Sequence, residues 1–265
     1  MKRCRKSRQR WAYGFTTAWM LIGMNNAAAE TVSGSAAHAL ETPWSYRGEN
    51  GPAKWGELTE KFRLCAEGSA QSPIDITTAT ISDLAPIRFD YDDSPIYLVN
   101  NGHTIQFNYA KGSSLAVGGE RFELIQFHFH SPSEHTLGGK VFPLEAHLVH
   151  KADNGKLVVV AVLFEEGDEN TLVARLWEHL PTYDGEMRVL HKMKINVRSL
   201  LPPGRTYFTY RGSLTTPPCT ENVTWLVMSA PVAVSRAQVE QFRRIYANNA
   251  RPVMPLNGRV VKLAH

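Results

Sequence analysis

The chain has 265 residues, of which 43% are hydrophobic and 20% charged, a composition that fits one large or two small globular domains with an ample core. Its formal net charge of +4 is carried by the leader, because residues 1–29 hold six basic residues and no acid, which leaves 23 basic and 25 acidic residues beyond it. The composition therefore argues against a nucleic-acid partner.

Residues 1–29 have the three parts of a secretory signal peptide: a basic start, an apolar stretch from Trp11 to Met24, and small residues before Glu30. We predict cleavage after Ala29. An uncleaved membrane anchor is the alternative, but about 14 moderately apolar residues are short of the ~20 that a spanning helix needs. Residues 30–42 are small and polar, and are predicted to form a flexible N-terminal tail.

A single domain is predicted over residues 43–265, since no repeat or linker interrupts them. It begins with an irregular aromatic arm at 43–58, and short strands joined mainly by hairpins follow over 74–117. The apolar run 156–164 predicts a strand buried on both faces, and leucines spaced by four predict a helix over 169–180. Ser235 and Gln238 form a capping-box signature for a second helix. The predicted class is α+β, mainly β, with antiparallel strands and short peripheral helices.

Histidines and carboxylates concentrate between Leu124 and His150. His128 and His130 are two residues apart, so both project from one face of a strand, and Gln126 shares that face. A second strand carries Glu145 and His147, and an antiparallel return would set His147 beside the first pair. Three neutral imidazoles would leave a fourth tetrahedral position open on zinc, which is the arrangement of a catalytic site.

A pair of strand histidines is more often structural than metal-binding, but the neighbouring residues favour a metal site. Ile125, Phe127 and Phe129 make the opposite face apolar, while Gln126 and Glu145 each stand two residues before a histidine as acceptors for its second ring N–H. The helical HExxH pattern of zinc proteases is absent. The chemistry left for zinc is hydration of carbon dioxide or hydrolysis of an activated ester, although cobalt or iron would also fit three imidazoles.

The cysteines are few. Cys4 leaves with the leader, so the mature chain keeps Cys65 and Cys219. An even count in an exported protein favours a disulfide, which would stabilise the fold by roughly 4 to 5 kcal/mol in the chain-entropy model. Two free buried thiols are the alternative.

Several motifs stand in a fixed order along the chain: QSPIDI at 71–76, NGH at 101–103, QFHFH at 126–130, SEHT at 133–136, EAHLVH at 145–150, GSLTTPPC at 212–219 and RP with PLN at 251–257. In these motifs, and in Trp44 and Tyr46, the chain resembles the bacterial, exported α-class carbonic anhydrases from Pro43 to its end. The resemblance implies a large twisted, mostly antiparallel sheet with zinc in a conical cavity. It also implies the Cys65–Cys219 disulfide.

The activity that the resemblance implies is zinc-dependent, reversible hydration of carbon dioxide to bicarbonate and a proton by a zinc-bound hydroxide. Its site residues carry over as zinc ligands His128, His130 and His147, with Gln126, Glu145 and the backbone carbonyl near Asn249 as their acceptors. Thr215 would accept a hydrogen bond from the hydroxide and give its own proton to Glu134. His103 would be the proton shuttle, because an imidazole suits relay near neutral pH.

The same resemblance implies a substrate pocket. Thr216 would hydrogen-bond bicarbonate or water, and an apolar wall would hold carbon dioxide. The wall is expected to consist of Val149, Val160, Leu214, Val223 and Trp225. Ordinary strand core is the alternative for each of these residues taken singly.

Two other functions stay open at this stage: a carbonic-anhydrase-like binding module without turnover, and a zinc esterase. The presence of all three zinc histidines favours the enzyme. The expected partners are carbon dioxide and bicarbonate, with no nucleic acid and no stable membrane anchor after cleavage, and a homodimer is conceivable. The expected location is the periplasm.

Overall fold

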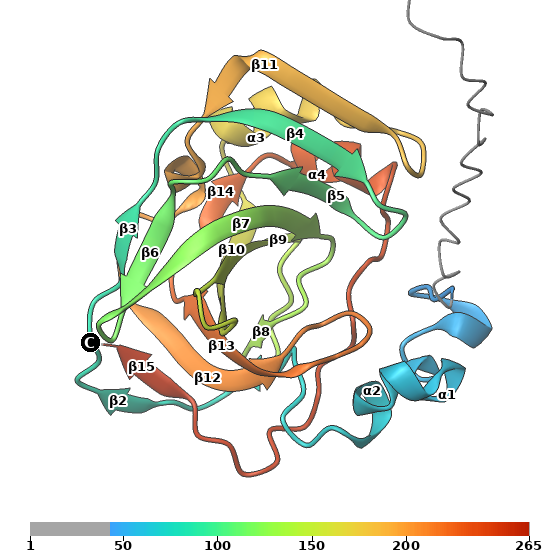
Figure 1. Cartoon of the computed structure of the whole chain (residues 1–265), viewed down its shortest axis with the longest axis vertical. Helices are drawn as coiled ribbons and strands as arrows, with labels where there is room; N and C mark the ends of the chain where they lie inside the picture. Colours follow the sequence, from blue (N-terminus) through green and yellow to red (C-terminus); the bar gives the residue numbers. More distant parts are fainter. Residues whose placement is uncertain (1–42, 265) are drawn as a thin grey trace, which may run out of the picture. The chain divides into compact units, whose positions relative to one another are not determined.

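The computed structural model describes residues 43–264, which are built around a mixed sheet of 13 strands (Figure 1). The predicted signal peptide and N-terminal tail lie outside these described residues. Most neighbouring strands are antiparallel, and the parallel pairs within this sheet are β10 with β13, β10 with β14, and β15 with β2. The predicted class, mainly β with a mostly antiparallel sheet and short helices, is confirmed.

The main path of the sheet runs in the order β11-β4-β5-β7-β9-β10-β13-β12-β15-β2, while β6 pairs with β7 and β3, and β14 pairs with β10. The strands are β1 (Asp75–Ile76), β2 (Thr80–Ser82), β3 (Arg88–Asp90), β4 (Ser94–Asn100), β5 (Ile105–Asn108), β6 (Ser114–Val117), β7 (Glu120–His130), β8 (Thr136–Leu137), β9 (Leu144–Lys151), β10 (Leu157–Glu166), β11 (Met187–Ile195), β12 (Tyr207–Ser213), β13 (Glu221–Met228), β14 (Val232–Val234) and β15 (Lys262–Ala264). The short strands β1 and β8 form a separate parallel pair. The strand-rich segment predicted over 74–117 is confirmed.

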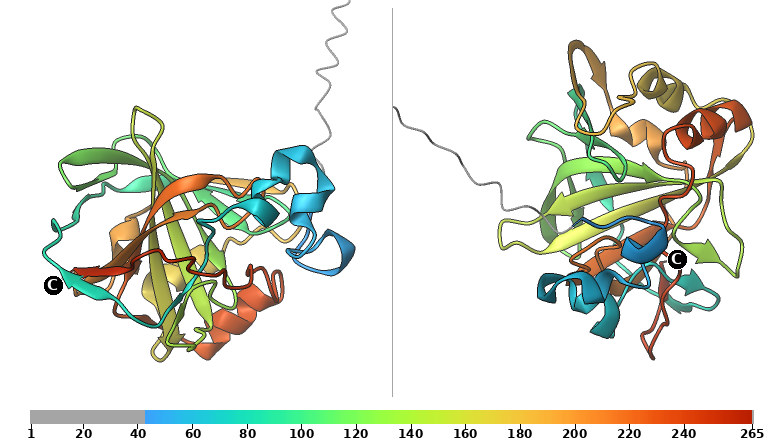
Figure 2. Two further views of the ribbon diagram at one scale, coloured as in Figure 1. Left: turned by 90° about the horizontal axis from the view of Figure 1, so that it is seen from below. Right: turned by 90° about the vertical axis from the view of Figure 1, so that its right-hand side faces the viewer.

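The helices are short. They are η1 (Gly48–Asn50), α1 (Trp55–Leu58), η2 (Glu60–Phe62), α2 (Leu64–Glu67), α3 (Thr171–Trp177), η3 (Val197–Leu200) and α4 (Arg236–Arg243). The side chain of Asn170 caps α3, and the predicted capping box of Ser235 and Gln238 starts α4. Figures 1 and 2 show α3 and α4 together on one side of the sheet, away from α1 and α2.

Strand β10 separates two apolar cores because its side chains alternate between the two faces of the sheet. Val158, Val160 and Val162 belong to the larger core, which also takes in the buried faces of α3 and α4. Val159 and Ala161 belong to the smaller core on the other face, together with Trp225. The prediction that this strand is buried on both faces is confirmed.

The aromatic arm is irregular apart from η1 and α1, and α2, which follows it, carries one half of the predicted disulfide. The sulfur atoms of Cys65 and Cys219 are bonded at 2.08 Å across a sequence separation of 154 residues. Trp55 is fully buried beside this bond. Within residues 43–264, no helix is long and apolar enough to cross a membrane.

Candidate metal centre

Three histidines meet where β7 and β9 pair. The antiparallel register sets His128 opposite His147, and His130 lies two residues beyond His128 on the same face. The ring centroids of His130 and His147 are 4.5 Å apart, and those of His128 and His130 are 5.0 Å apart. One ring nitrogen from each histidine lies within 4.8 Å of the others. The convergence predicted from strand alternation is therefore present.

Each of these imidazoles is held through one ring nitrogen. Nδ1 of His128 is 2.9 Å from Oε1 of Gln126, Nδ1 of His130 is 2.7 Å from the carbonyl oxygen of Asn249, and Nε2 of His147 is 2.8 Å from Oε1 of Glu145. Because these acceptors take the ring N–H groups, Nε2 of His128, Nε2 of His130 and Nδ1 of His147 are left as lone-pair donors. The structure thus brings the three predicted ligands to their three predicted acceptors.

The donor set fits zinc. Nε2 of His130 is buried and has no hydrogen-bond partner among the described residues, an arrangement that is costly unless something else satisfies the nitrogen. Burial lowers the pKa of both His128 and His130, which keeps their imidazoles neutral, the form that binds a metal ion. Burial lowers the pKa of His147 too, but the carboxylate of Glu145 outweighs burial and raises that pKa, so this ring must lose any proton on Nδ1 when a metal ion binds. Three ring nitrogens directed at one point match a zinc site with an open fourth position.

Glu145 is the anchor of the site. Its carboxylate, fully buried, accepts hydrogen bonds from the backbone N–H groups of Glu134 and His135, at 2.7 and 2.8 Å, in addition to those from two imidazoles. Burial alone would raise the pKa of Glu145, but the two histidines beside it and their hydrogen bonds hold that pKa well below its usual range. The ionised carboxylate can therefore orient His147.

His135 is a part of this network that sequence reasoning left without a role. Its Nδ1 is 2.7 Å from Oε1 of Glu145, and its Nε2 is 2.7 Å from the hydroxyl of Tyr210, which is also hydrogen-bonded to Ser72. Gln106, which pairs with His128 across β5 and β7, was also missed. The signal for His135 was its place between Glu134 and Thr136 in the SEHT motif, but its partner Tyr210 is 75 residues away.

Glu134 lies beside the metal site, but its hydrogen bonds differ from those predicted. Its Oε1 accepts a hydrogen bond of 2.8 Å from the backbone N–H of Arg251. Its Oε2 is 3.6 Å from Nε2 of His130 and has no hydrogen-bond partner among residues 43–264. The expected hydrogen bond from Thr215 to Glu134 is therefore not formed in this structure, although Thr215 is buried.

A cavity of about 120 Å³ opens beside the histidines. It is lined by the predicted residues His103 and Thr216, by His128 and His130, and also by Trp44, Tyr46, Asn101, Thr104, Gln106 and Gln126. The ring of His103 stacks on Trp44 with centroids 3.5 Å apart. The structure therefore places the predicted shuttle and the predicted bicarbonate-binding threonine in one cavity with two of the three metal-site histidines.

The apolar wall needs one correction. Val149, Leu214, Val223 and Trp225 share the smaller core, and Trp225 packs against His147 with ring centroids 4.8 Å apart. Val160 is in the larger core instead, because successive side chains of β10 point to opposite faces of the sheet. The residue of β10 on the wall side is Val159, which pairs with Val149 and with Trp225 in the two neighbouring strands.

Comparison with known proteins gives consistent matches over most of the chain. A family model described as "Eukaryotic-type carbonic anhydrase" matches residues 50–265. A carbonic anhydrase of Neisseria gonorrhoeae is 43% identical over 87% of this chain and 92% of its own. The solved α-carbonic anhydrase of Photobacterium profundum is 47% identical with a TM-score of 0.79, over 84% of this chain and 100% of its own. The α-carbonic anhydrase of Thermovibrio ammonificans, solved in complex with the inhibitor sulfanilamide, is 44% identical with a TM-score of 0.81, over 84% of this chain and 99% of its own.

Proposed function

Because this chain belongs to the eukaryotic-type, or α-class, carbonic anhydrases, we propose that His128, His130 and His147 hold its zinc ion and that His103, Glu134 and Thr215 serve the reaction. The chain is accordingly a zinc enzyme that hydrates carbon dioxide reversibly to bicarbonate and a proton. The observation that carries the residue assignment is the convergence of three ring nitrogens whose partner nitrogens are already hydrogen-bonded.

Zinc bound by these residues supplies a Lewis acid that lowers the pKa of a water ligand, an effect for which carbonic anhydrases are themselves the standard example. The protein's own task is to present three neutral imidazoles in fixed orientations. Gln126 and the carbonyl of Asn249 do this for His128 and His130 as neutral acceptors, while Glu145 does it for His147 with a full negative charge. Such acceptors raise the basicity of the ligand and fix its tautomer.

Glu134 and Thr215 would orient the nucleophile. A threonine hydroxyl that donates its proton to a carboxylate can only accept from its other neighbour, so the pair would set the direction in which a proton of the nucleophile points. The backbone N–H of Arg251 fixes Oε1 of Glu134, and its buried Oε2 is available for the Thr215 hydroxyl. The proposal requires the Thr215 hydroxyl to come within hydrogen-bond distance of Oε2 in the working enzyme.

Carbon dioxide is apolar, so it should be held by an apolar surface beside the metal. Val149, Val159, Leu214, Val223 and Trp225 offer such a surface, with Val149 and Leu214 only partly buried. Thr216 lines the cavity and would hydrogen-bond the bicarbonate product. Conversion of the apolar substrate into an anion would favour movement of the bound molecule from the apolar wall toward Thr216.

His103 would carry the proton away from the site. It lies in the cavity wall, and its backbone is fixed because its carbonyl accepts a hydrogen bond of 3.1 Å from Nδ2 of Asn249. Its ring stacks on Trp44 with the two planes 10° apart. An imidazole in this place can receive a proton through water molecules and release it to buffer.

The Cys65–Cys219 disulfide supports a location outside the reducing cytoplasm, because such bonds persist mainly in oxidising compartments. Export to the periplasm by a signal peptide cleaved after Ala29 would deliver the chain to such a compartment. We retain both as proposals, together with a single domain over residues 43–265 and the formation of a homodimer.

The residue assignment is tested by stopped-flow hydration of carbon dioxide and by zinc analysis of the purified proteins. His128→Ala should lose bound zinc and lower kcat/KM at least a hundredfold, whereas His191→Ala, which removes an exposed histidine of β11, should change neither. Equal activity of wild type and His128→Ala would contradict the assignment.

The role of His103 is tested by His103→Ala. This substitution should slow maximal turnover in dilute buffer, and added imidazole should restore the turnover, while kcat/KM changes little. Equal losses in kcat and kcat/KM would argue for a structural role.

A further inference from the structure

His103 stands in a hairpin turn whose shape is fixed by its own residues. The turn joins β4 to β5, and Oδ1 of Asn101 accepts hydrogen bonds from the backbone N–H groups of His103 and Thr104, at 3.0 and 2.9 Å. Gly102, in the left-handed region at a φ of 82°, donates its N–H to Oδ1 of Asn100 at 3.1 Å. Because these contacts lie within the turn, they set its shape but not its distance from the metal-site histidines.

Two side chains connect this turn to the strand that carries the metal-site histidines. Backbone pairing between β5 and β7 covers residues 106–108 of β5, with Gln106 opposite His128. Closer to the turn, the carbonyl oxygen of Phe129, the residue after His128, accepts a hydrogen bond of 2.6 Å from Oγ1 of Thr104. The same oxygen accepts one of 3.0 Å from Nδ2 of Asn249. A carbonyl oxygen has two lone pairs, so both are used here.

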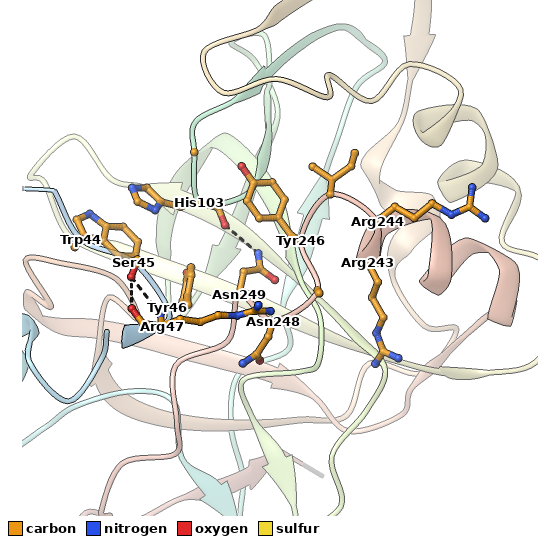
Figure 3. Close-up of a pocket in the computed structure, with 13 residues that line it drawn as sticks. Trp44, Ser45, Tyr46, Arg47, His103, Arg243, Arg244, Tyr246, Asn248 and Asn249 are labelled. Atoms are coloured by element: carbon orange, nitrogen blue, oxygen red, sulfur yellow. Dashed lines mark hydrogen bonds between the residues drawn. The ribbon is translucent and has the colours of Figure 1, made fainter. Parts of the chain in front are cut away.

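The buried side chain of Asn249 is the centre of this connection. Its Nδ2 donates to the carbonyl oxygens of Phe129 and His103, at 3.0 and 3.1 Å, and its Oδ1 accepts from the backbone N–H of Ser131 at 2.9 Å. Only this orientation of the amide matches two acceptors and one donor. In Figure 3 the carboxamide points at the backbone of His103, while the imidazole lies beside Trp44. The amide therefore holds the turn through its backbone.

The beginning of the turn is held separately. The hydroxyl of Tyr246 donates a hydrogen bond to Oδ1 of Asn100, the last residue of β4. Thr104 and Asn249 hold the other end, at which His103 stands. Loss of the hydrogen bonds at this end should therefore shift His103 without releasing the turn as a whole.

We propose that Asn249, through its side-chain amide, and Thr104, through its hydroxyl, are positioning residues that hold His103 at the distance from the metal site which proton transfer needs. A proton reaches the imidazole through water molecules only when both ends of the path are well placed, and a misplacement of about 1 Å can cost roughly a hundredfold in rate. This role is separate from that of the Asn249 backbone carbonyl, which orients His130. The inference rests on the proposed function, since it takes His103 as the shuttle.

The test is stopped-flow hydration of carbon dioxide by the zinc enzyme in dilute buffer. Asn249→Asp keeps an oxygen for the N–H of Ser131 and the backbone carbonyl for His130, but it loses both donated hydrogen bonds. We expect kcat to fall roughly tenfold and to recover with added imidazole, while kcat/KM and the zinc affinity in competition with a chelator change by less than about twofold. Asn257→Asp is the matched control, because it removes a hydrogen bond of the same kind, from Nδ2 to the carbonyl oxygen of Ser69, at an exposed site. The control should leave kcat within about twofold of the wild type.

A second pair of variants adds no charge. Thr104→Val removes the hydroxyl that binds the Phe129 carbonyl and should lower kcat roughly threefold at constant kcat/KM, whereas Thr104→Ser keeps the hydroxyl and should restore most of the loss. This pair also decides the matter if Asn249→Asp fails to fold. Both Asn249→Asp and Thr104→Val are then repeated in His103→Ala. Neither should lower kcat further there, because a residue that acts through His103 has nothing left to position.

Three results would overturn the proposal. Equal losses in kcat and kcat/KM, or weakened zinc binding, would assign the side chain of Asn249 to the metal site instead. A further loss of kcat in the His103→Ala background would show that the effect does not pass through the shuttle. Wild-type kcat in both Asn249→Asp and Thr104→Val, with His103→Ala slow, would show that the turn needs neither hydrogen bond. Failure of the shuttle itself is distinguishable, because His103→Ala would then keep wild-type turnover, and the proposed role of His103 would fall together with this inference.

Discussion

A buried histidine outside the metal site should make the stability of the fold depend on pH. His150 is fully buried, and its Nε2 is 2.7 Å from the hydroxyl of Tyr91. Burial raises the pKa of Tyr91 well above its usual value, so the phenol keeps its proton and can donate it to Nε2. Nδ1 of His150 has no hydrogen-bond partner within residues 43–264. Burial therefore favours the neutral ring and lowers the pKa of His150 to about 3.

The sign and size of the effect follow from this shift. The unfolded chain takes up a proton on His150 below the ordinary pKa of about 6.5, while the folded chain does not until about pH 3, so stability is lost as the pH falls through this window. Between pH 7.5 and pH 5.5 the loss from this residue is about 1.4 kcal/mol, because one pH unit below the unfolded pKa is worth that amount.

The perturbation is His150→Gln, which removes the titrating ring and keeps a polar side chain near Tyr91. At pH 7.5 the variant should be less stable by about 1 to 3 kcal/mol, from lost packing and a poorer hydrogen bond. At pH 5.5 the gap should shrink by about 1.4 kcal/mol, because the wild type alone has lost that stability. Proton uptake by the zinc ligands cancels in the difference, since both proteins share them.

The assay is urea unfolding of both zinc-loaded proteins at pH 7.5 and pH 5.5, with His191→Gln as the exposed control. The control should keep a constant difference from the wild type. A gap between wild type and His150→Gln that is the same at both pH values, within about 0.5 kcal/mol, would refute the reasoning.

Two further predictions concern the carboxylate of Glu145 and the disulfide between Cys65 and Cys219. Glu145→Gln should weaken zinc binding roughly tenfold to a hundredfold in competition with a chelator, because His147 loses a charged acceptor; undiminished affinity would show that the charge is not needed. Cys65→Ser with Cys219→Ser should lower the free energy of unfolding by roughly 5 kcal/mol in the chain-entropy model, given the separation of 154 residues. Identical thermal stability with and without a reductant would contradict a stabilising role for the bond.

The metal-site histidines could be predicted from the sequence because the relevant geometry is local. Alternation along one strand fixes which side chains of β7 share a face, and the turn residues after it indicate an antiparallel return. Acceptors two residues before His128 and His147 lie on the same faces by the same rule. The capping box of α4 was predictable for the same reason, since both of its members lie within one helical turn.

The apolar wall could not be assigned in this way. The run from Lys156 to Phe164 has no polar residue after its first position, so the sequence contains no alternation from which to decide which valines face the metal. The choice of Val160 in place of Val159 was wrong by one residue, and a shift of one residue in a strand reverses the face. Only the pairing with Val149 and Trp225 settles it.

Hydrogen-bond partners that are distant along the chain could not be predicted from the sequence either. Tyr210 reaches His135 across 75 residues, and the backbone of Arg251 reaches Glu134 across 117. A cavity of about 320 Å³ is lined by residues 44–47 of the aromatic arm and by residues 243–249 at and beyond the end of α4, and no spacing rule connects these two segments. Such contacts depend on how elements pack, and packing is decided by the whole core.

The central claim is that three histidines bind one zinc ion that hydrates carbon dioxide. The most direct test is zinc X-ray absorption on the purified enzyme, paired with stopped-flow hydration on the same sample. We predict one zinc per chain with three imidazole nitrogens at about 2.0 to 2.1 Å and no sulfur ligand, together with rapid hydration. A fully zinc-loaded protein with no hydration above the buffer rate, or with a different ligand set, would contradict the account.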